Sequence, residues 1–215
     1  MTWLNMGQIL RVHAKNYPSK VALKDWRGKA LTYPELESRT NRLANGLLRM
    51  GLRKGDRVAV MLYNSVEFVE VDCASAKAGL VVVPVNWRYV EREIEYVVDN
   101  SDSKAMIVGE DFVDCVDRIR KGFKKIGADN YVSVGSKRFE GYVDYEQLIA
   151  SSPDTSPDVH VEGKDTWFQI YTSGTTGIPK GVVRSHQSYI AFYLINAVEF
   201  GFSEKDKGMI VMPLY

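Results

Sequence analysis

Between residues 58 and 134, short apolar segments alternate with segments that have the apolar spacing of helices. The apolar segments are rich in valine and do not alternate strictly with polar residues. Strands of this kind are buried on both faces, and an intervening helix lets successive strands run parallel. The pattern predicts an α/β fold, a mainly parallel sheet with helices on both faces. The predicted strands are Val58–Leu62, Val81–Val85, Ala105–Val108 and Tyr131–Val134.

The segments around these strands carry the end signals of helices and turns. Pro34 suits the first turn of a helix that ends at Gly51, a natural C-terminal cap. Ser65 is a candidate N-cap for the next helix, and Gly28 is expected to turn an earlier hairpin. The predicted hairpin strands are Val21–Lys24 and Ala30–Tyr33. Four helices are expected after the hairpin, and their core-facing positions are Leu36, Leu43, Leu47 and Met50 in the first, Val66, Val69, Cys73 and Ala76 in the second, Val90, Ile94, Val97 and Val98 in the third, and Phe112, Cys115, Val116 and Ile119 in the fourth.

The last third of the chain predicts a further strand, Trp167–Tyr171, and a short extended piece, Gly181–Arg184. Ser185 can cap a helix that follows, and Met209–Met212 is expected to form a final apolar strand. The positions expected to face inward on this helix are Ile190, Leu194, Ala197 and Val198, and the aromatic residues expected in the core are Tyr189, Phe192 and Tyr193.

A serine-, proline- and aspartate-rich stretch, residues 151–158, is the one low-complexity part of the sequence. Such a composition indicates a solvated linker or a long surface loop. We therefore predict an N-terminal α/β subdomain at 1–150, a linker or surface loop at 151–165, and the start of a nucleotide-binding portion at 166–215.

Charge and cysteine usage exclude several kinds of partner and site. Lysine and arginine total 28 against 27 acidic residues, a net charge of +1, which offers no electrostatic basis for binding nucleic acid or an anionic membrane. Cys73 and Cys115 lack the spacing of metal ligands and are expected to be reduced thiols, so no metal site is predicted. Arg11 interrupts any signal-peptide core, and Leu80–Val85 is too short to cross a bilayer. We expect no integral membrane segment, and we expect a cytoplasmic location.

Residues 172–180 combine four hydroxyl side chains, two glycines and a lysine between two predicted strands. Glycines let backbone N–H groups approach an anion, hydroxyls add donors, and the lysine adds a positive charge. A flexible turn is the simplest alternative. A P-loop nucleotidase is a second one, but its motif has Gly-Lys followed by Ser or Thr at a helix start. Here Pro179 precedes Lys180 and Gly181 follows it, so the P-loop pattern fits poorly.

This run resembles the phosphate-loop signature of the adenylate-forming superfamily, which includes acyl-CoA synthetases and aryl-acid CoA ligases. The Asn86-Trp87-Arg88 segment favours a free acyl- or aryl-CoA ligase within that superfamily. The segments that carry the resemblance are Leu31-Thr32-Tyr33-Pro34-Glu35-Leu36, Gly55-Asp56-Arg57-Val58-Ala59-Val60, Val83-Pro84-Val85-Asn86, Thr172-Ser173-Gly174-Thr175-Thr176-Gly177-Ile178-Pro179-Lys180-Gly181, Val182-Val183-Arg184-Ser185-His186 and Met212-Pro213-Leu214-Tyr215.

The resemblance implies a two-step reaction in which a carboxylate attacks ATP to give an acyl-adenylate and pyrophosphate, and the thiol of CoA then displaces AMP. It implies ATP, Mg²⁺ and CoA as cofactors of the full-length enzyme, and a small carboxylic acid as substrate. Lys180 would add charge on the pyrophosphate side, and Tyr215 would lie beside the acyl pocket. For His186 a packing or capping role is favoured, and for Arg88 a structural one. The residues implied to surround the β- and γ-phosphates are Thr172, Ser173, Gly174, Thr175, Thr176 and Gly177, together with Lys180.

The resemblance covers only the first part of the superfamily's large N-terminal domain. Its adenine motif, ribose-binding acid, magnesium glutamate and C-terminal domain have no counterpart in these 215 residues. We therefore expect a fragment of a longer ligase that is inactive alone and self-associates through exposed apolar surface. A P-loop-like nucleotidase and a non-catalytic binding fragment remain the alternatives, and the identity of the acid stays open.

Overall fold

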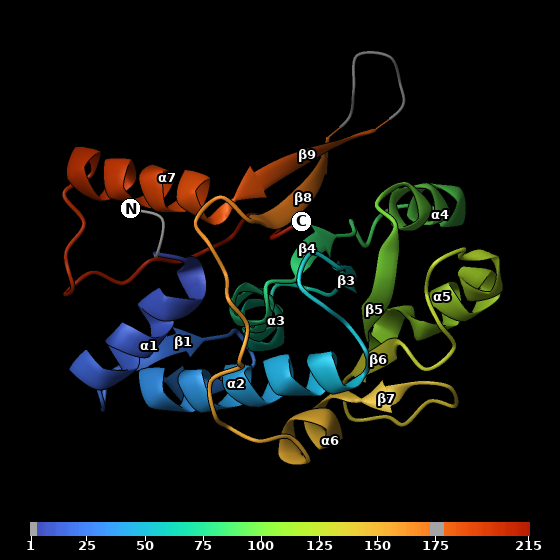
Figure 1. Ribbon diagram of the computed structural model, residues 1–215, viewed down its shortest axis with the longest axis horizontal. Coiled ribbons are helices and arrows are strands. Elements are labelled where there is room, and N and C mark those ends of the chain that lie inside the picture. The colour runs from blue at the N-terminus through green and yellow to red at the C-terminus, as the bar shows by residue number, and fades with distance from the viewer. Residues whose placement is uncertain (1–3, 173–178) are drawn as a thin grey trace.

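In the computed structural model, which describes residues 4–172 and 179–215, a seven-stranded sheet forms the centre of the molecule (Figure 1). Its strands are β3 (Arg57–Met61), β4 (Val81–Pro84), β5 (Ser103–Gly109), β6 (Tyr131–Val134), β7 (Val143–Asp144), β8 (Thr166–Thr172) and β9 (Lys180–Ser185). Their order is β7-β6-β5-β3-β4-β8-β9, with every neighbouring pair parallel except the antiparallel pair β8–β9. The predicted α/β class with a mainly parallel sheet is confirmed.

Helices cover both faces of this sheet, and a two-stranded hairpin lies to one side of it (Figure 1). The helices are α1 (Met6–Asn16), α2 (Tyr33–Arg49), α3 (Val66–Ala78), α4 (Glu91–Asn100), α5 (Val113–Ile119), α6 (Tyr145–Ala150) and α7 (His186–Glu199), with 3₁₀ turns at Glu110–Phe112 and Arg120–Gly122. The hairpin strands are β1 (Val21–Lys24) and β2 (Ala30–Thr32). Helices α2, α3 and α6 contribute to the core on one face, and α4 and α5 to the core on the other.

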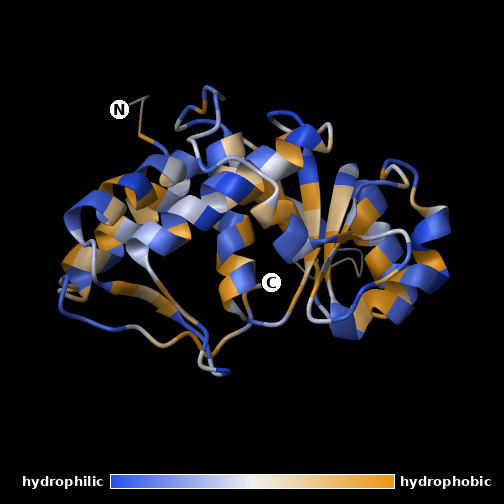
Figure 2. Cartoon of the chain, turned by 90° about the horizontal axis from the view of Figure 1, so that it is seen from below, coloured by the Kyte–Doolittle hydropathy of each residue, from blue (hydrophilic) through white to orange (hydrophobic). Residues whose placement is uncertain are grey.

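The central strands are apolar on both faces because each face supports its own core. Along β3, Val58 and Val60 face the core beneath α2 and α3, whereas Ala59 and Met61 face the core beneath α4 and α5. Figure 2 shows the same contrast, with hydrophobic colour concentrated on the central strands and only one stripe of it on most helices. The absence of strict alternation in the sequence thus follows from two-sided burial.

Pro34 lies in the first turn of α2, as the sequence predicts, and Thr32 before it adds a cap that the sequence analysis did not single out. The Thr32 backbone N–H donates to Glu35 Oε2 at 2.8 Å and Thr32 Oγ1 accepts from the Glu35 N–H at 3.4 Å, which makes a capping box at the start of α2. Ser65 caps α3 by accepting from the Phe68 N–H at 3.2 Å. Gly28 turns the β1–β2 hairpin with φ +90°, a left-handed conformation that favours glycine.

Helix α3 departs from its prediction as a helix with one apolar stripe. It is buried nearly all round, because it lies between the sheet and helices α1 and α2. Phe68 and Val71 pack into the core beneath the sheet, while Val66 packs into a smaller cluster with Leu10 and Leu31. The predicted positions therefore divide between the two clusters, with Val66 and Cys73 in the smaller one and Ala76 in the core beneath the sheet.

Two further expectations about burial and one about a strand are wrong. Val90 is 64% exposed, because it precedes the first turn of α4. Leu194 and Val198 of α7 are exposed, because only the first turns of that helix pack against other described residues. The segment Met209–Met212 is not a strand: no described strand pairs with it, and Met209 is 86% exposed.

Residues 151–161, which we call the strap, cross the outer side of α2. Asn45 Nδ2 donates to the backbone oxygens of Pro153 and Thr155 at 2.9 and 2.8 Å. Asn41 Nδ2 donates to the Asp154 oxygen at 2.9 Å, and Arg42 Nη1 to the Ser152 oxygen at 2.7 Å. The first part of the strap is therefore held by side chains of α2, whereas Lys54 and Asn5 bind the backbone oxygens of His160 and Val161 at its end. The predicted divisions at 150 and 165 stay a prediction.

Candidate functional site

The carboxyl ends of the parallel strands gather at one edge of the sheet. Strand β3 ends at Met61, β4 at Pro84 and β8 at Thr172. The chain leaves β3 toward α3 on one face and leaves β4 toward α4 on the other, so the connections diverge between neighbouring strands. In open α/β sheets, ligands bind outside the carboxyl ends at such a switch point. This edge is the candidate site.

The predicted phosphate-binding run lies at this edge. Thr172 ends β8 and faces Lys180, which begins β9, across the antiparallel pair. Both are exposed. The remaining predicted residues, Ser173, Gly174, Thr175, Thr176 and Gly177, lie outside the described residues. The described structure therefore brings one predicted hydroxyl and the predicted ammonium group together at the strand ends.

Gly181 allows β9 to lie close to two side chains of β8. A Cβ atom built at Gly181 would lie 2.7 Å from Gln169 Nε2 and 3.1 Å from Tyr171 Cζ. Both distances are shorter than ordinary van der Waals contact, so a side chain here would displace its neighbours. The glycine next to Lys180 thus has a packing role in addition to any role near an anion.

Aromatic side chains line the same edge beside the switch point. The ring of Trp87 lies 5.1 Å from that of Tyr63 and 6.4 Å from that of Tyr215, measured between centroids. Phe112 lies 4.8 Å from Tyr63, and the Arg88 guanidinium lies 4.7 Å from the Trp87 ring. Tyr215 therefore joins an aromatic cluster, and Arg88 packs on it as a structural arginine would. Sequence reasoning missed Tyr63, although it directly follows the predicted strand Val58–Leu62, and it assigned Phe112 to a helix core only.

Asn64 holds the segment that carries Tyr215. Its Nδ2 donates to the Met212 backbone oxygen at 2.8 Å, and its Oδ1 accepts from the Leu214 N–H at 3.0 Å. These two bonds imitate the pairing that a neighbouring strand would offer. No local pattern indicates this role of Asn64, because the bond joins residues about 150 positions apart in the chain.

His186 is a packing residue, as favoured from the sequence. It is fully buried, stacks on Trp167 at 5.5 Å with an 8° angle between the rings, and accepts from the Met6 N–H at Nδ1. Burial lowers the pKa of His186 to about 4. Of the predicted aromatic core, Tyr189 packs on Trp167, but Phe192 and Tyr193 are about half exposed, which corrects that expectation.

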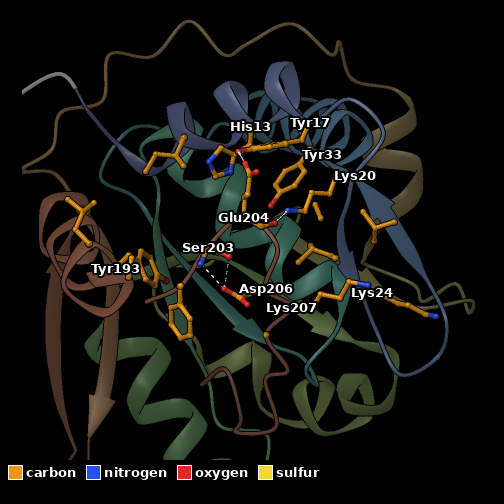
Figure 3. Close-up of a pocket in the computed structure, with 18 of the residues that line it drawn as sticks. His13, Tyr17, Lys20, Lys24, Tyr33, Tyr193, Ser203, Glu204, Asp206 and Lys207 are labelled. Carbon is orange, nitrogen blue, oxygen red and sulfur yellow. Dashed lines mark hydrogen bonds between the residues drawn. The ribbon is translucent and has the colours of Figure 1, made fainter. Parts of the chain in front are cut away.

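A pocket lies away from the carboxyl edge of the sheet, between α1, β1, α7 and residues 202–208 (Figure 3). Its volume is 1190 Å³, and its walls include His13, Tyr33 and Tyr193. The Tyr17 hydroxyl donates to Glu204 Oε2 at 3.0 Å across one side of it. None of the described residues that the sequence analysis assigned to phosphate or acyl binding lines this pocket.

The described residues contain no group of three or more His, Cys, Asp or Glu side chains placed to hold a metal ion. Within the same part of the chain, no helix combines the length and apolar character needed to cross a bilayer. Both cysteines are free thiols.

A model of the AMP-binding enzyme family matches residues 10–215. The chain belongs to the AMP-binding enzyme family. This AMP-binding chain is 32% identical over 213 residues to the long-chain-fatty-acid–CoA ligase FadD13 of Mycobacterium tuberculosis, covering 98% of the chain and 41% of FadD13. It is 35% identical over 185 residues to the fatty acid–[acyl-carrier-protein] ligase ScoC of Streptomyces coeruleorubidus, covering 86% of the chain and 33% of ScoC.

The fold agrees with this membership. The crystal structure of the anthranilate CoA ligase AuaEII in complex with anthranoyl-AMP superposes with a TM-score of 0.83 at 26% identity, covering 93% of this chain and 37% of AuaEII. The chain therefore spans less than half the length of FadD13, ScoC and AuaEII.

Proposed function

We propose that this chain supplies the phosphate-binding part of an ATP-dependent, AMP-forming ligase that joins a carboxylic acid to CoA. The observation that carries the proposal is the pairing of Thr172 with Lys180 at the carboxyl edge of the sheet. This pairing lies within the match to the AMP-binding enzyme family.

The donor set suits a polyphosphate. In the proposed reaction a carboxylate attacks the α-phosphorus of ATP, pyrophosphate leaves, and the CoA thiol later displaces AMP from the acyl-adenylate. Lys180 would place a positive charge beside the leaving pyrophosphate, and the Thr172 hydroxyl would add a hydrogen-bond donor. Positive charge and donors placed where negative charge develops stabilise a transition state. Ser173–Gly177 are proposed to contribute further donors by resemblance.

The proposed acid is a fatty acid, and the proposed acceptor of the acyl group is CoA. Both come from relatives: FadD13 is named a long-chain-fatty-acid–CoA ligase. ScoC is named a fatty acid–[acyl-carrier-protein] ligase, so whether CoA or a carrier protein accepts the acyl group needs a separate test. The free thiols of Cys73 and Cys115 agree with a reducing cytoplasm as the proposed location.

The described residues do not fit a Mg²⁺ site. The described residues offer no carboxylate cluster that could bind a divalent ion. The resemblance also assigns no residue of these 215 to adenine, ribose or magnesium. We therefore propose that the 215 residues alone form no acyl-adenylate and bind ATP only weakly. Exchange of label between pyrophosphate and ATP by this chain would contradict that proposal.

Substitution of Lys180 tests the proposed anion site. Inorganic tripolyphosphate serves as the probe, and its dissociation constant is measured by NMR titration of the 215-residue chain. Lys180→Ala is expected to weaken binding about tenfold, because a charge-assisted contact is lost. Lys121→Ala, which removes an exposed lysine of the Arg120–Gly122 turn, is the matched control.

Equal affinities of the Lys180→Ala and Lys121→Ala variants would overturn the anion site. Hydrolysis of ATP by the chain without any carboxylic acid would indicate a nucleotidase instead.

A further inference from the structure

The β8–β9 hairpin that carries the candidate site lies beside β4 in the sheet, and the hydrogen-bonded ladder between β8 and β4 is short. Strand β8 pairs with β4 at one register position, Val82 opposite Phe168. Near the start of β8, Trp167 Nε1 donates to the Asp72 backbone oxygen of α3 at 3.0 Å. Neither contact reaches the end of β8 at Thr172. Other contacts must therefore set the position of that end.

Helix α4 makes those contacts from one of its faces. Tyr96 and Asn100 are four residues apart, so they lie one above the other on the helix. The Tyr96 hydroxyl donates to the Pro179 backbone oxygen at 3.0 Å, directly before Lys180. The Tyr171 hydroxyl donates to Asn100 Oδ1 at 2.7 Å, directly before Thr172. One helix face thus holds both strand ends.

The two contacts form one packed unit. The rings of Tyr96 and Tyr171 meet edge to face, with centroids 6.3 Å apart and an 86° angle between the planes. Gln169 Nε2 donates to the Tyr171 hydroxyl at 3.1 Å, so this hydroxyl both accepts and donates. Tyr171 is buried, and burial raises its pKa to about 12, so it stays a neutral donor at physiological pH. The absence of a side chain at Gly181 leaves the room that Gln169 and Tyr171 occupy.

We propose that Tyr96 and Asn100 are positioning residues of the anion site, holding Pro179 and Tyr171 so that Lys180 and Thr172 face the same ligand. The proposal rests on the function proposed above for Lys180. It adds that α4, which comes from a different part of the chain, sets the position of the Lys180 ammonium group. Neither residue contacts the ligand in this arrangement.

Tyr96→Phe tests the proposal, because it removes one hydroxyl and keeps the ring. Tyr142→Phe is the matched control: its hydroxyl donates to Asp117 Oδ1 at 3.0 Å, in a different part of the molecule. Two quantities are measured on the 215-residue chain: the hydrogen exchange of the backbone amides of Thr172, Lys180 and Gly181, and the dissociation constant for tripolyphosphate. Unfolding midpoints in urea show whether each variant folds as the wild type does.

In Tyr96→Phe we expect the exchange rates of these three amides to rise about fivefold, because one hydrogen bond is lost. The dissociation constant for tripolyphosphate should rise by the same factor. The amide of Val60 in β3 should exchange as in the wild type, and Tyr142→Phe should change neither quantity. Asn100→Ala, which leaves the Tyr171 hydroxyl without its acceptor, should produce the same changes. A uniform rise in exchange that includes Val60 would show a general structural role and overturn the proposal.

The outcomes separate this proposal from the function on which it rests. If Lys180→Ala weakens tripolyphosphate binding and Tyr96→Phe does not, the positioning role is wrong and the anion site stands. If the wild-type chain binds no tripolyphosphate, the anion site is wrong for this chain, and no positioning role for it survives. Unchanged exchange at Lys180 and Gly181 in both α4 variants would overturn the role whatever the binding result.

Discussion

At the scale of single residues, His186 makes the stability of the molecule depend on pH. The pKa of His186 is about 4 in the folded chain, against an ordinary value near 6.5 when unfolded, because the ring is buried. The unfolded state therefore binds the proton more readily, and stability is lost as pH falls from about 6.5 toward 4. Protonation at Nδ1 would also oppose the Met6 N–H, which donates to that atom.

We expect the free energy of unfolding to fall by about 1 kcal/mol from this group between about pH 7.5 and pH 5.5. Urea unfolding at both pH values measures it. His186→Asn, which keeps an acceptor near the Met6 N–H, should show a smaller fall over the same interval. An identical fall in both proteins would show that other groups cause the pH dependence.

Gly181 is the second position where a single residue decides local packing. Gly181→Ala should lower the free energy of unfolding by about 1 to 3 kcal/mol, since its Cβ would displace Gln169 and Tyr171. Gly208→Ala is the matched control, because a Cβ there meets nothing within 4 Å. Thermal or urea unfolding of the two variants measures the difference. Equal stabilities would mean that β9 shifts to accommodate the methyl group at little cost.

At the scale of elements, the strap depends on polar side chains of α2 that point away from the core. Asn45→Ala removes the two bonds from Asn45 Nδ2 to Pro153 and Thr155. We expect the free energy of unfolding to fall by about 1 kcal/mol and proteolytic cleavage between residues 153 and 159 to become faster. Asn196→Ala, which removes one side-chain bond within α7, should leave cleavage of the strap unchanged. Cleavage of the strap at the wild-type rate in Asn45→Ala would show that other contacts hold it.

At the scale of the whole molecule, α7 and the segment after it expose many large apolar side chains. Exposed side chains there are Phe192, Leu194, Ile195, Val198, Phe200, Phe202, Met209, Ile210, Val211 and Met212. Many exposed apolar side chains on neighbouring segments favour association with other protein surfaces. We expect the purified chain to self-associate, with a sedimentation coefficient that rises with concentration.

Ile195→Glu combined with Val198→Glu should lower this concentration dependence, because two charges are placed on the surface. Gln187→Glu, at an exposed polar position of the same helix, should leave it unchanged. A wild-type chain that sediments as a monomer at every concentration would contradict the prediction.

The sequence alone determined the features that depend on neighbours in the chain. Apolar runs marked the central strands, and Pro34 and Ser65 marked helix starts, because caps, turns and strand burial are set by nearby residues. The hydroxyl- and glycine-rich run before Lys180 predicted an anion site in the same way. Only the tertiary structure decided the order β5-β3-β4-β8, which brings Tyr63, Trp87 and Thr172 to one edge. It also decided that α3 is buried on two faces, that α7 is exposed, and that Tyr96 reaches Pro179. These features join residues far apart in the chain, and their energy comes from contacts that no local pattern encodes.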